Sequence, residues 1–139
     1  MSASYSEKKP TVVYISYLEK DDQILHLFNN LGDLNLIPVY SKRELEEILQ
    51  KIKVSGVIMG TLRVVEKAGK YEKNSYCATG LALVKTIKEI GLPLLVYSGA
   101  DEKILNEASR SGADRVFQKP SSIEKLIEAV NHLFITRNI

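Results

Sequence analysis

The sequence has 139 residues, 45% of them hydrophobic and 26% charged, with a formal net charge of +2. This length predicts one domain with its own core, and so small and dispersed a charge argues against direct nucleic-acid binding. No apolar run reaches the ~20 residues of a membrane span, and the single cysteine, Cys77, fits a reducing compartment. We therefore expect a cytoplasmic protein with no membrane contact, in which residues 1–10 form a flexible tail and residues 11–135 form the domain.

In the first part of the chain, apolar runs alternate with amphipathic segments. Residues 11–16 are rich in β-branched side chains and predict a buried strand. Apolar positions at helical spacing predict a helix over residues 21–31. Residues 34–40 form a second predicted strand, and its Pro38 indicates an edge strand because proline cannot donate to a central ladder.

The middle of the chain continues the alternation. Ser41 and Glu44 form a capping-box pattern that predicts the start of a second helix. Residues 54–60 predict a third, central strand. The irregular stretch 61–74 separates it from a predicted helix over residues 77–90.

The last part of the chain predicts two more strands and two more helices. The strands are residues 93–97 and 115–118, and the helix between them, residues 101–111, ends at Gly112. Ser121 and Glu124 are the predicted caps of the last helix. Its predicted apolar face consists of Ile123, Leu126, Ile127, Val130 and Phe134.

Strands that alternate with helices at this spacing predict parallel βαβ units with right-handed crossovers. The expected fold is therefore α/β and flavodoxin-like, a (βα)5 doubly wound sheet with strand order 2-1-3-4-5 and helices on both faces. Binding sites in such sheets lie beyond the carboxyl ends of the strands. We therefore expect the functional residues to lie near residues 16–20, 60–63, 98–101 and 119.

Three sequence features point to a known family. They are Pro93 followed by Tyr97-Ser98-Gly99-Ala100, then Gly112-Ala113-Asp114, and finally Lys119-Pro120. Together with the element order, they make residues 11–134 resemble the receiver domains of two-component response regulators. Receivers place a lysine followed by proline at the end of the last strand, which makes Lys119-Pro120 the most specific of the three.

The resemblance implies roles for particular positions. Receivers hold magnesium with two acidic residues after strand 1, which fall here on Ser16 and Tyr17. Their phospho-acceptor aspartate falls on Gly60. The hydroxyl and lysine that contact the phosphoryl oxygens fall on Ser98 and Lys119, which both match the family pattern.

The departures from the pattern define the expected function. Gly60 offers no acceptor side chain, and Val116 replaces the aromatic switch residue of the family. The retained residues are Ser98, Lys119 and Pro120. The resemblance therefore implies a pseudo-receiver that signals through protein–protein interaction without phosphorylation, with no catalytic residue, metal or cofactor and no enzymatic activity.

Several residues have two interpretations from sequence. Lys119 and Ser98 could hold a small anion, a nucleotide or a flavin in an alternative, ligand-binding module. Lys119 could instead bond backbone carbonyls, and Ser98 could cap the helix that begins near Asp101. Glu19 either pairs with Lys119 or is solvated.

Two surfaces are candidates for partner binding. The first is the loop within residues 61–74, with the candidate contacts Arg63, Lys67, Lys70, Tyr71 and Lys73. A solvated loop is the competing interpretation. The second is the face from the fourth to the fifth helix, which in receivers often mediates dimerisation or output. It suggests a homodimer here, and a solvated exterior is the competing interpretation. The sequence identifies neither the protein partner nor the pathway.

Overall fold

A computed structural model describes residues 9–16, 34–64, 78–119 and 122–135. Five parallel strands in these ranges form one sheet in the order β2-β1-β3-β4-β5. The strands are β1 (Thr11–Ile15), β2 (Asn35–Val39), β3 (Gly56–Met59), β4 (Leu94–Ser98) and β5 (Arg115–Gln118). The predicted strand order is confirmed, while the helix predicted over residues 21–31 lies outside the described residues.

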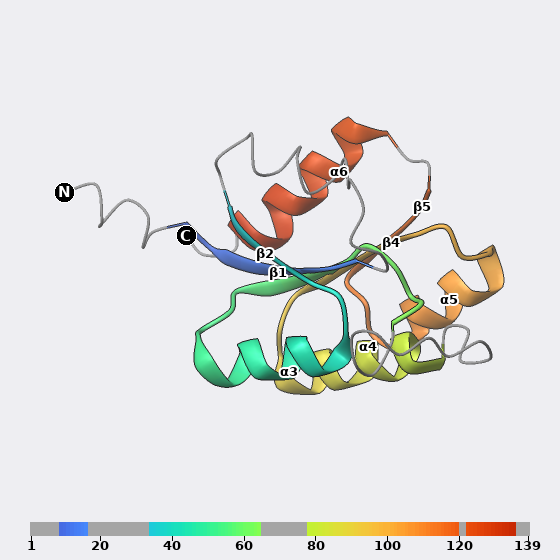
Figure 1. Ribbon diagram of the computed structural model, residues 1–139. Helices are drawn as coiled ribbons and strands as arrows, with labels where there is room; N and C mark the ends of the chain where they lie inside the picture. The colour runs from blue at the N-terminus through green and yellow to red at the C-terminus, as the bar shows by residue number, and fades with distance from the viewer. Residues whose placement is uncertain (1–8, 17–33, 65–77, 120–121, 136–139) are drawn as a thin grey trace.

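Helices cover both faces of the sheet (Figure 1). They are α3 (Lys42–Lys51), α4 (Ala78–Ile90), α5 (Glu102–Arg110) and α6 (Ile123–Val130), which continues into the π-helical segment η1 (Asn131–Ile135). Buried side chains of α3, α4 and α5 share one core cluster with the sheet, and those of α6 and η1 share another. The predicted flavodoxin-like fold is therefore confirmed. No helix in the described ranges is long and apolar enough to cross a membrane.

Pro38 lies in an edge strand, as predicted. Asn35 N donates to Pro10 O at 2.9 Å and Ser16 N donates to Val39 O at 3.0 Å, so alternate residues of β2 bond to β1. Pro38 occupies one of the positions between them, where an N–H would point away from the sheet. The proline therefore costs the sheet no hydrogen bond and removes a donor that another strand could use.

The first described helix begins with the predicted cap. Ser41 Oγ accepts a hydrogen bond from Glu44 N at 3.2 Å. The Glu44 side chain reaches back one residue further than expected, since its Oε1 accepts from Tyr40 N at 2.8 Å. Ser41 and Glu44 thus satisfy donors at the start of α3, which is the purpose of a capping box.

The last helix differs from the prediction in two respects. The N-cap is Ser122, whose Oγ accepts from Lys125 N at 3.4 Å, whereas Ser121 lies outside the described residues. Ile123, the first residue of α6, is 54% exposed and does not belong to the buried face. The buried face consists of Leu126, Ala129, Val130, Leu133 and Phe134.

The Gly112-Ala113-Asp114 motif has a structural role. Gly91 and Gly112, which follow α4 and α5, have φ values of 90° and 117°, a conformation that favours glycine. Asp114 Oδ2 then accepts from Lys88 Nζ at 2.7 Å and from Leu94 N at 2.8 Å. These bonds join the end of α4 to the starts of β4 and β5, at the amino-terminal ends of the strands.

Candidate functional site

Four of the predicted site positions lie at the carboxyl ends of the strands, which we call the carboxyl edge of the sheet. Gly60 N donates to Ile15 O at 2.8 Å, which places the end of β3 beside Ser16. Lys119 N donates to Ser98 O at 2.9 Å, which places the end of β5 beside the end of β4. The structure therefore brings Ser16, Gly60, Ser98 and Lys119 to one edge, where parallel sheets of this class carry their sites.

The space above Gly60 is occupied by the ring of Tyr14. A Cβ atom added to Gly60 would lie 2.6 Å from Tyr14 Cζ and 2.8 Å from Cε1, and it would be closer still to the hydroxyl oxygen. Real Cβ atoms do not approach other atoms so closely. Tyr14 is only 1% exposed and belongs to the core cluster on the α6 side. Gly60 therefore has no room for a side chain while the ring stays in place.

Sequence reasoning did not find this contact. The sequence predicts that Tyr14 lies in a buried strand but does not indicate which residues its ring contacts. The signal is in the strand register: Tyr14 pairs with Ile58, and Gly60 follows Ile58 on the same face of β3. Once this register is known, a large ring on β1 and a glycine diagonally opposite, directly after β3, indicate the contact.

Lys119 reaches back across the sheet edge to β3. Its Nζ donates to Gly60 O at 2.9 Å and lies 5.2 Å from the centroid of the Tyr97 ring. A carbonyl acceptor and an aromatic face both stabilise an ammonium group. Lys119 thus makes the backbone contact that one of the two sequence interpretations expects. Glu19, its other expected partner, lies outside the described residues.

Ser98 does not cap α5. Its Oγ accepts from Ala100 N at 3.1 Å, so the hydroxyl stabilises the turn after β4. Asp101 is the N-cap of α5, because its Oδ1 accepts from Ile104 N at 3.0 Å. Ser98 is 4% exposed and is one of two buried polar residues among those described.

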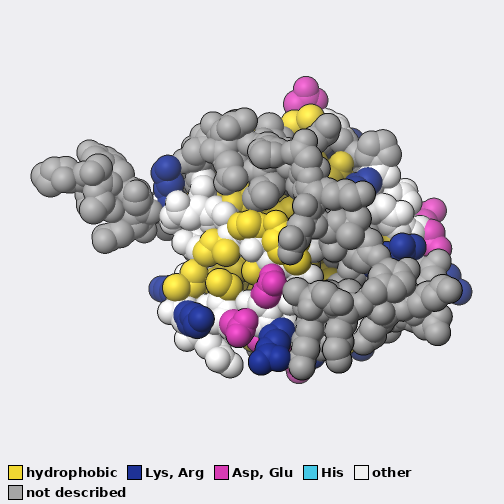
Figure 2. All heavy atoms as spheres, in the orientation of Figure 1, with side chains coloured by type: hydrophobic (Ala, Val, Ile, Leu, Met, Phe, Trp, Pro, Cys, Tyr) yellow, Lys and Arg dark blue, Asp and Glu magenta, His cyan; other side chains and the backbone are white. Residues whose placement is uncertain are grey.

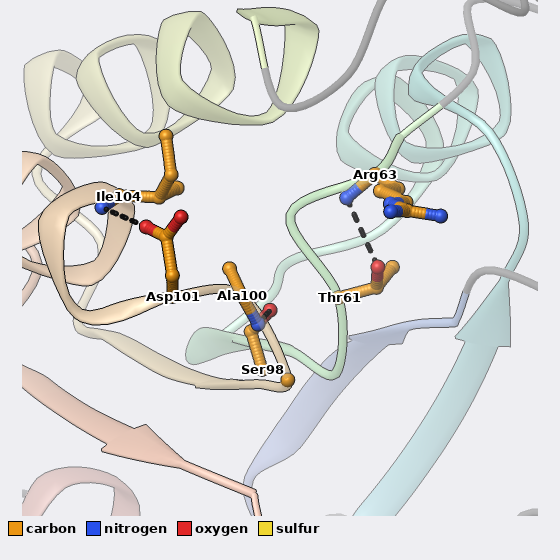
Figure 3. Close-up of a pocket in the computed structure, with 7 residues that line it drawn as sticks. Thr61, Arg63, Ser98, Ala100, Asp101 and Ile104 are labelled. Atoms are coloured by element: carbon orange, nitrogen blue, oxygen red, sulfur yellow. Dashed lines mark hydrogen bonds between the residues drawn. The ribbon is translucent and has the colours of Figure 1, made fainter.

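A cleft of about 390 Å³ lies between the loops that follow β3 and β4 (Figure 3). It is lined by Thr61, Arg63, Ser98, Gly99, Ala100, Asp101 and Ile104. Thr61 and Arg63 form one wall and Asp101 and Ile104 the other, with Ser98 at the base. Of the pair expected to bind an anion, Ser98 lines this cleft, whereas Lys119 is not among its lining residues.

The described residues of the carboxyl edge do not supply the carboxylates with which receiver domains hold magnesium. Magnesium and calcium bind oxygen ligands, chiefly carboxylates. Ser16 and Gly60 supply no carboxylate at two positions where receivers have one, and Tyr17 lies outside the described residues. Within the described ranges, no three His, Cys, Asp or Glu residues are grouped so as to hold a metal ion.

Neither a family model nor a curated protein matches the sequence. Solved structures do match. A two-component response regulator from Clostridium difficile has a TM-score of 0.71 and 17% identity, covering 94% of this chain and 100% of that one. The receiver domain of the Francisella response regulator 1452 has a TM-score of 0.71 and 19% identity over the same shares. A Burkholderia pseudomallei response regulator, with a phosphorylated aspartic acid, calcium ion and citrate, has a TM-score of 0.65 and 17% identity, covering 93% and 68%.

This chain has the receiver fold. Within that fold, Val116 on β5 is half-buried and packs against the cluster that α3, α4 and α5 share with the sheet. Of the five loop residues predicted to contact a partner, Arg63 is described and is exposed. The other four loop residues and Pro120 lie outside the described residues, so their roles stay predictions.

Replacing Lys119 with methionine tests its contact with β3. We expect K119M to lower the free energy of unfolding by about 1 kcal/mol, because Gly60 O loses a charged donor. Urea unfolding of K119M measures the effect. The matched control is Lys103→Met on α5, an exposed site where the same change is expected to be neutral. Equal stabilities for both variants would show that the Lys119 contact contributes nothing.

Proposed function

We propose that this chain is a signalling domain of the receiver type that works by binding a protein partner and does not accept a phosphoryl group. The contact between Tyr14 and Gly60 is the observation that carries the proposal. The phospho-acceptor of a receiver presents an aspartate carboxylate oxygen to the incoming phosphorus, and glycine has none. The ring of Tyr14 also fills the space in which such a side chain would stand.

The rest of the carboxyl edge supports the same conclusion. Phosphoryl transfer relies on a metal ion and positioned donors to stabilise the charge on the phosphoryl oxygens. The described residues that meet at this edge supply no carboxylate for a metal ion, and Lys119 Nζ already donates to Gly60 O at 2.9 Å. Ser98 Oγ is likewise engaged by Ala100 N. Ser98 and Lys119 thus have hydrogen-bond partners within the domain in the absence of a phosphoryl group.

The outer surface offers apolar area for a protein partner. Hydrophobic side chains are exposed between β2 and α3 on the face drawn in Figure 2. The partly or largely exposed hydrophobic residues here are Ile37 and Pro38 of β2, Ile48 and Leu49 of α3, and Ile52, which follows α3. Leu36 of β2 is also partly exposed, but it packs against the cluster on the α6 side of the sheet. Because Pro38 removes a donor from the edge of β2, a partner at this surface would pack against side chains instead of adding a strand.

Intact-protein mass spectrometry tests the proposal. The wild-type chain is incubated with acetyl phosphate and magnesium, and we expect no increase in mass by one phosphoryl group. A receiver domain that carries the acceptor aspartate serves as the positive control under the same conditions. Stoichiometric phosphorylation of the wild-type chain would overturn the proposal.

The second candidate function is small-ligand binding, and the cleft that contains Ser98 and Arg63 favours it. Its volume of about 390 Å³ is at the low end of the range for ligand sites. The same protein sample, heated with inorganic phosphate or with flavin mononucleotide, discriminates between the two functions. A concentration-dependent rise in Tm would support ligand binding, and an unchanged Tm with both compounds would count against it.

A further inference from the structure

We propose that Tyr14 and Gly60 are an interdependent pair in which the phenol ring permanently fills the acceptor position of the receiver fold. A side chain can return to position 60 only after the ring has been removed. The meaning of this pair for signalling rests on the proposed function, but the contact itself is a property of the core. Position 60 thus lacks an acceptor for two reasons: glycine has no carboxylate, and the Tyr14 ring fills the space that a side chain would need.

The strand register explains why these two residues meet. Tyr14 on β1 pairs with Ile58 on β3. Side chains alternate between the two faces of a strand, so position 60 projects to the same face as Ile58 and is the diagonal neighbour of Tyr14. Diagonal neighbours are within reach of an aromatic side chain. The ring of Tyr14 therefore extends along the sheet to the end of β3.

Neither the Tyr14 ring nor the Gly60 backbone can move away from the contact without loss of packing or hydrogen bonds. Tyr14 is 1% exposed and is packed in a cluster that includes Ile58, Leu95 and Leu126. Both polar groups of the Gly60 backbone are hydrogen-bonded. Gly60 N donates to Ile15 O at 2.8 Å, and Gly60 O accepts from Lys119 Nζ at 2.9 Å. Displacing the ring or the backbone would disrupt buried packing or these hydrogen bonds.

The backbone conformation of Gly60 does not itself require glycine. The described glycines with positive φ are Gly91 and Gly112, and Gly60 is not one of them. An alanine at position 60 would therefore meet a packing conflict and no backbone strain. This separates the effect of the Tyr14 ring from the general cost of replacing a glycine.

A double-mutant cycle measures the interdependence. The four proteins are wild type, G60A, Y14V and Y14V/G60A, and urea unfolding gives the folding equilibrium constant of each. We expect G60A to lower this constant about tenfold or more in the wild-type background, because overpacking a core costs that much. In the Y14V background we expect a change of less than about threefold, since the smaller side chain leaves room for the new methyl group.

Three further substitutions control for other causes. In a Y14F background the ring remains 2.6 Å from the added Cβ through Cζ, so G60A should cost nearly as much as in wild type. Gly99→Ala should be neutral, because nothing lies within 4 Å of a Cβ at that position. Gly56→Ala meets the Phe134 ring instead and should cost the same in the wild-type and Y14V backgrounds.

Equal costs of G60A in the wild-type and Y14V backgrounds would overturn the inference. If Y14V does not unfold cooperatively, Tyr14→Leu replaces it in the same comparison. The cycle measures stability and not phosphorylation, so its failure would leave the proposed function standing. Conversely, phosphorylation of the wild-type chain at another residue would overturn the proposed function and leave the packing of Tyr14 against Gly60 unchanged.

Discussion

Replacing Gly80 with alanine is expected to lower the free energy of unfolding by about 3 kcal/mol or more. Gly80 lies in the first turn of α4 against the backbone of Leu62. A Cβ there would lie 2.7 Å from Leu62 C and 2.9 Å from its Cα, with the carbonyl oxygen closer still. Backbone atoms cannot move aside as a flexible side chain can, so α4 must shift away from the loop.

The expected loss at Gly80 is opposite in sign to the usual effect of this substitution. Within a helix, alanine is normally better than glycine by about 1 kcal/mol. The close approach of Leu62 is expected to reverse that preference at Gly80. Urea or thermal unfolding measures the change, and Thr79→Ala, one residue earlier in α4, is the matched control that should be neutral or slightly stabilising. A G80A variant as stable as wild type would show that α4 is not packed so closely.

Gly80 also bears on the candidate site. Leu62 lies between Thr61 and Arg63, which line one wall of the cleft beside Ser98. Leu62 is fully buried and packs in the cluster that contains α4 residues such as Leu83. The contact at Gly80 therefore holds this wall of the cleft against α4. We expect G80A to perturb the wall more strongly than it perturbs the distant end of the sheet.

Much of the fold is predictable because burial leaves a direct mark on the sequence. Strands covered by helices on both faces are continuous apolar runs, which is how β1, β3 and β4 are recognised. Pro38 marks the edge strand because of its missing N–H. The capping box at Ser41 is recognisable because it depends on residues three apart in the sequence. These signals depend on residues that are close together in the sequence, so they can be recognised without a structure.

The parts that escaped prediction depend on geometry between distant residues. The choice between Ser121 and Ser122 as the cap depends on which hydroxyl reaches Lys125 N, since both positions carry serine, which is a good cap. Lys119 has a long side chain with several acceptors in reach, and the fold decides that Gly60 O is its partner. The contact between Tyr14 and Gly60 needs the register of two strands, which sequence alone does not define.

Replacing Phe134 with alanine is expected to lower the free energy of unfolding by about 3–5 kcal/mol, the usual cost of removing a buried aromatic ring. Phe134 is 1% exposed, and its ring lies in the space that a side chain at Gly56 would take. It belongs to η1, the π-helical segment that ends the last helix. The ring thus docks the C-terminal helix onto the start of β3.

Ile123→Ala is the matched control, because Ile123 begins the same helix but is 54% exposed. We expect this change to stay within about 0.5 kcal/mol of wild type, since exposed positions contribute little packing. Equal losses for both variants would show that α6 is not held through Phe134. A large loss for F134A alone would show that this ring stabilises the packing of the last helix against the sheet. Phe134 packs at Gly56, where β3 begins, and Tyr14 packs at Gly60, directly after β3 ends, so an aromatic ring lies at each end of this strand.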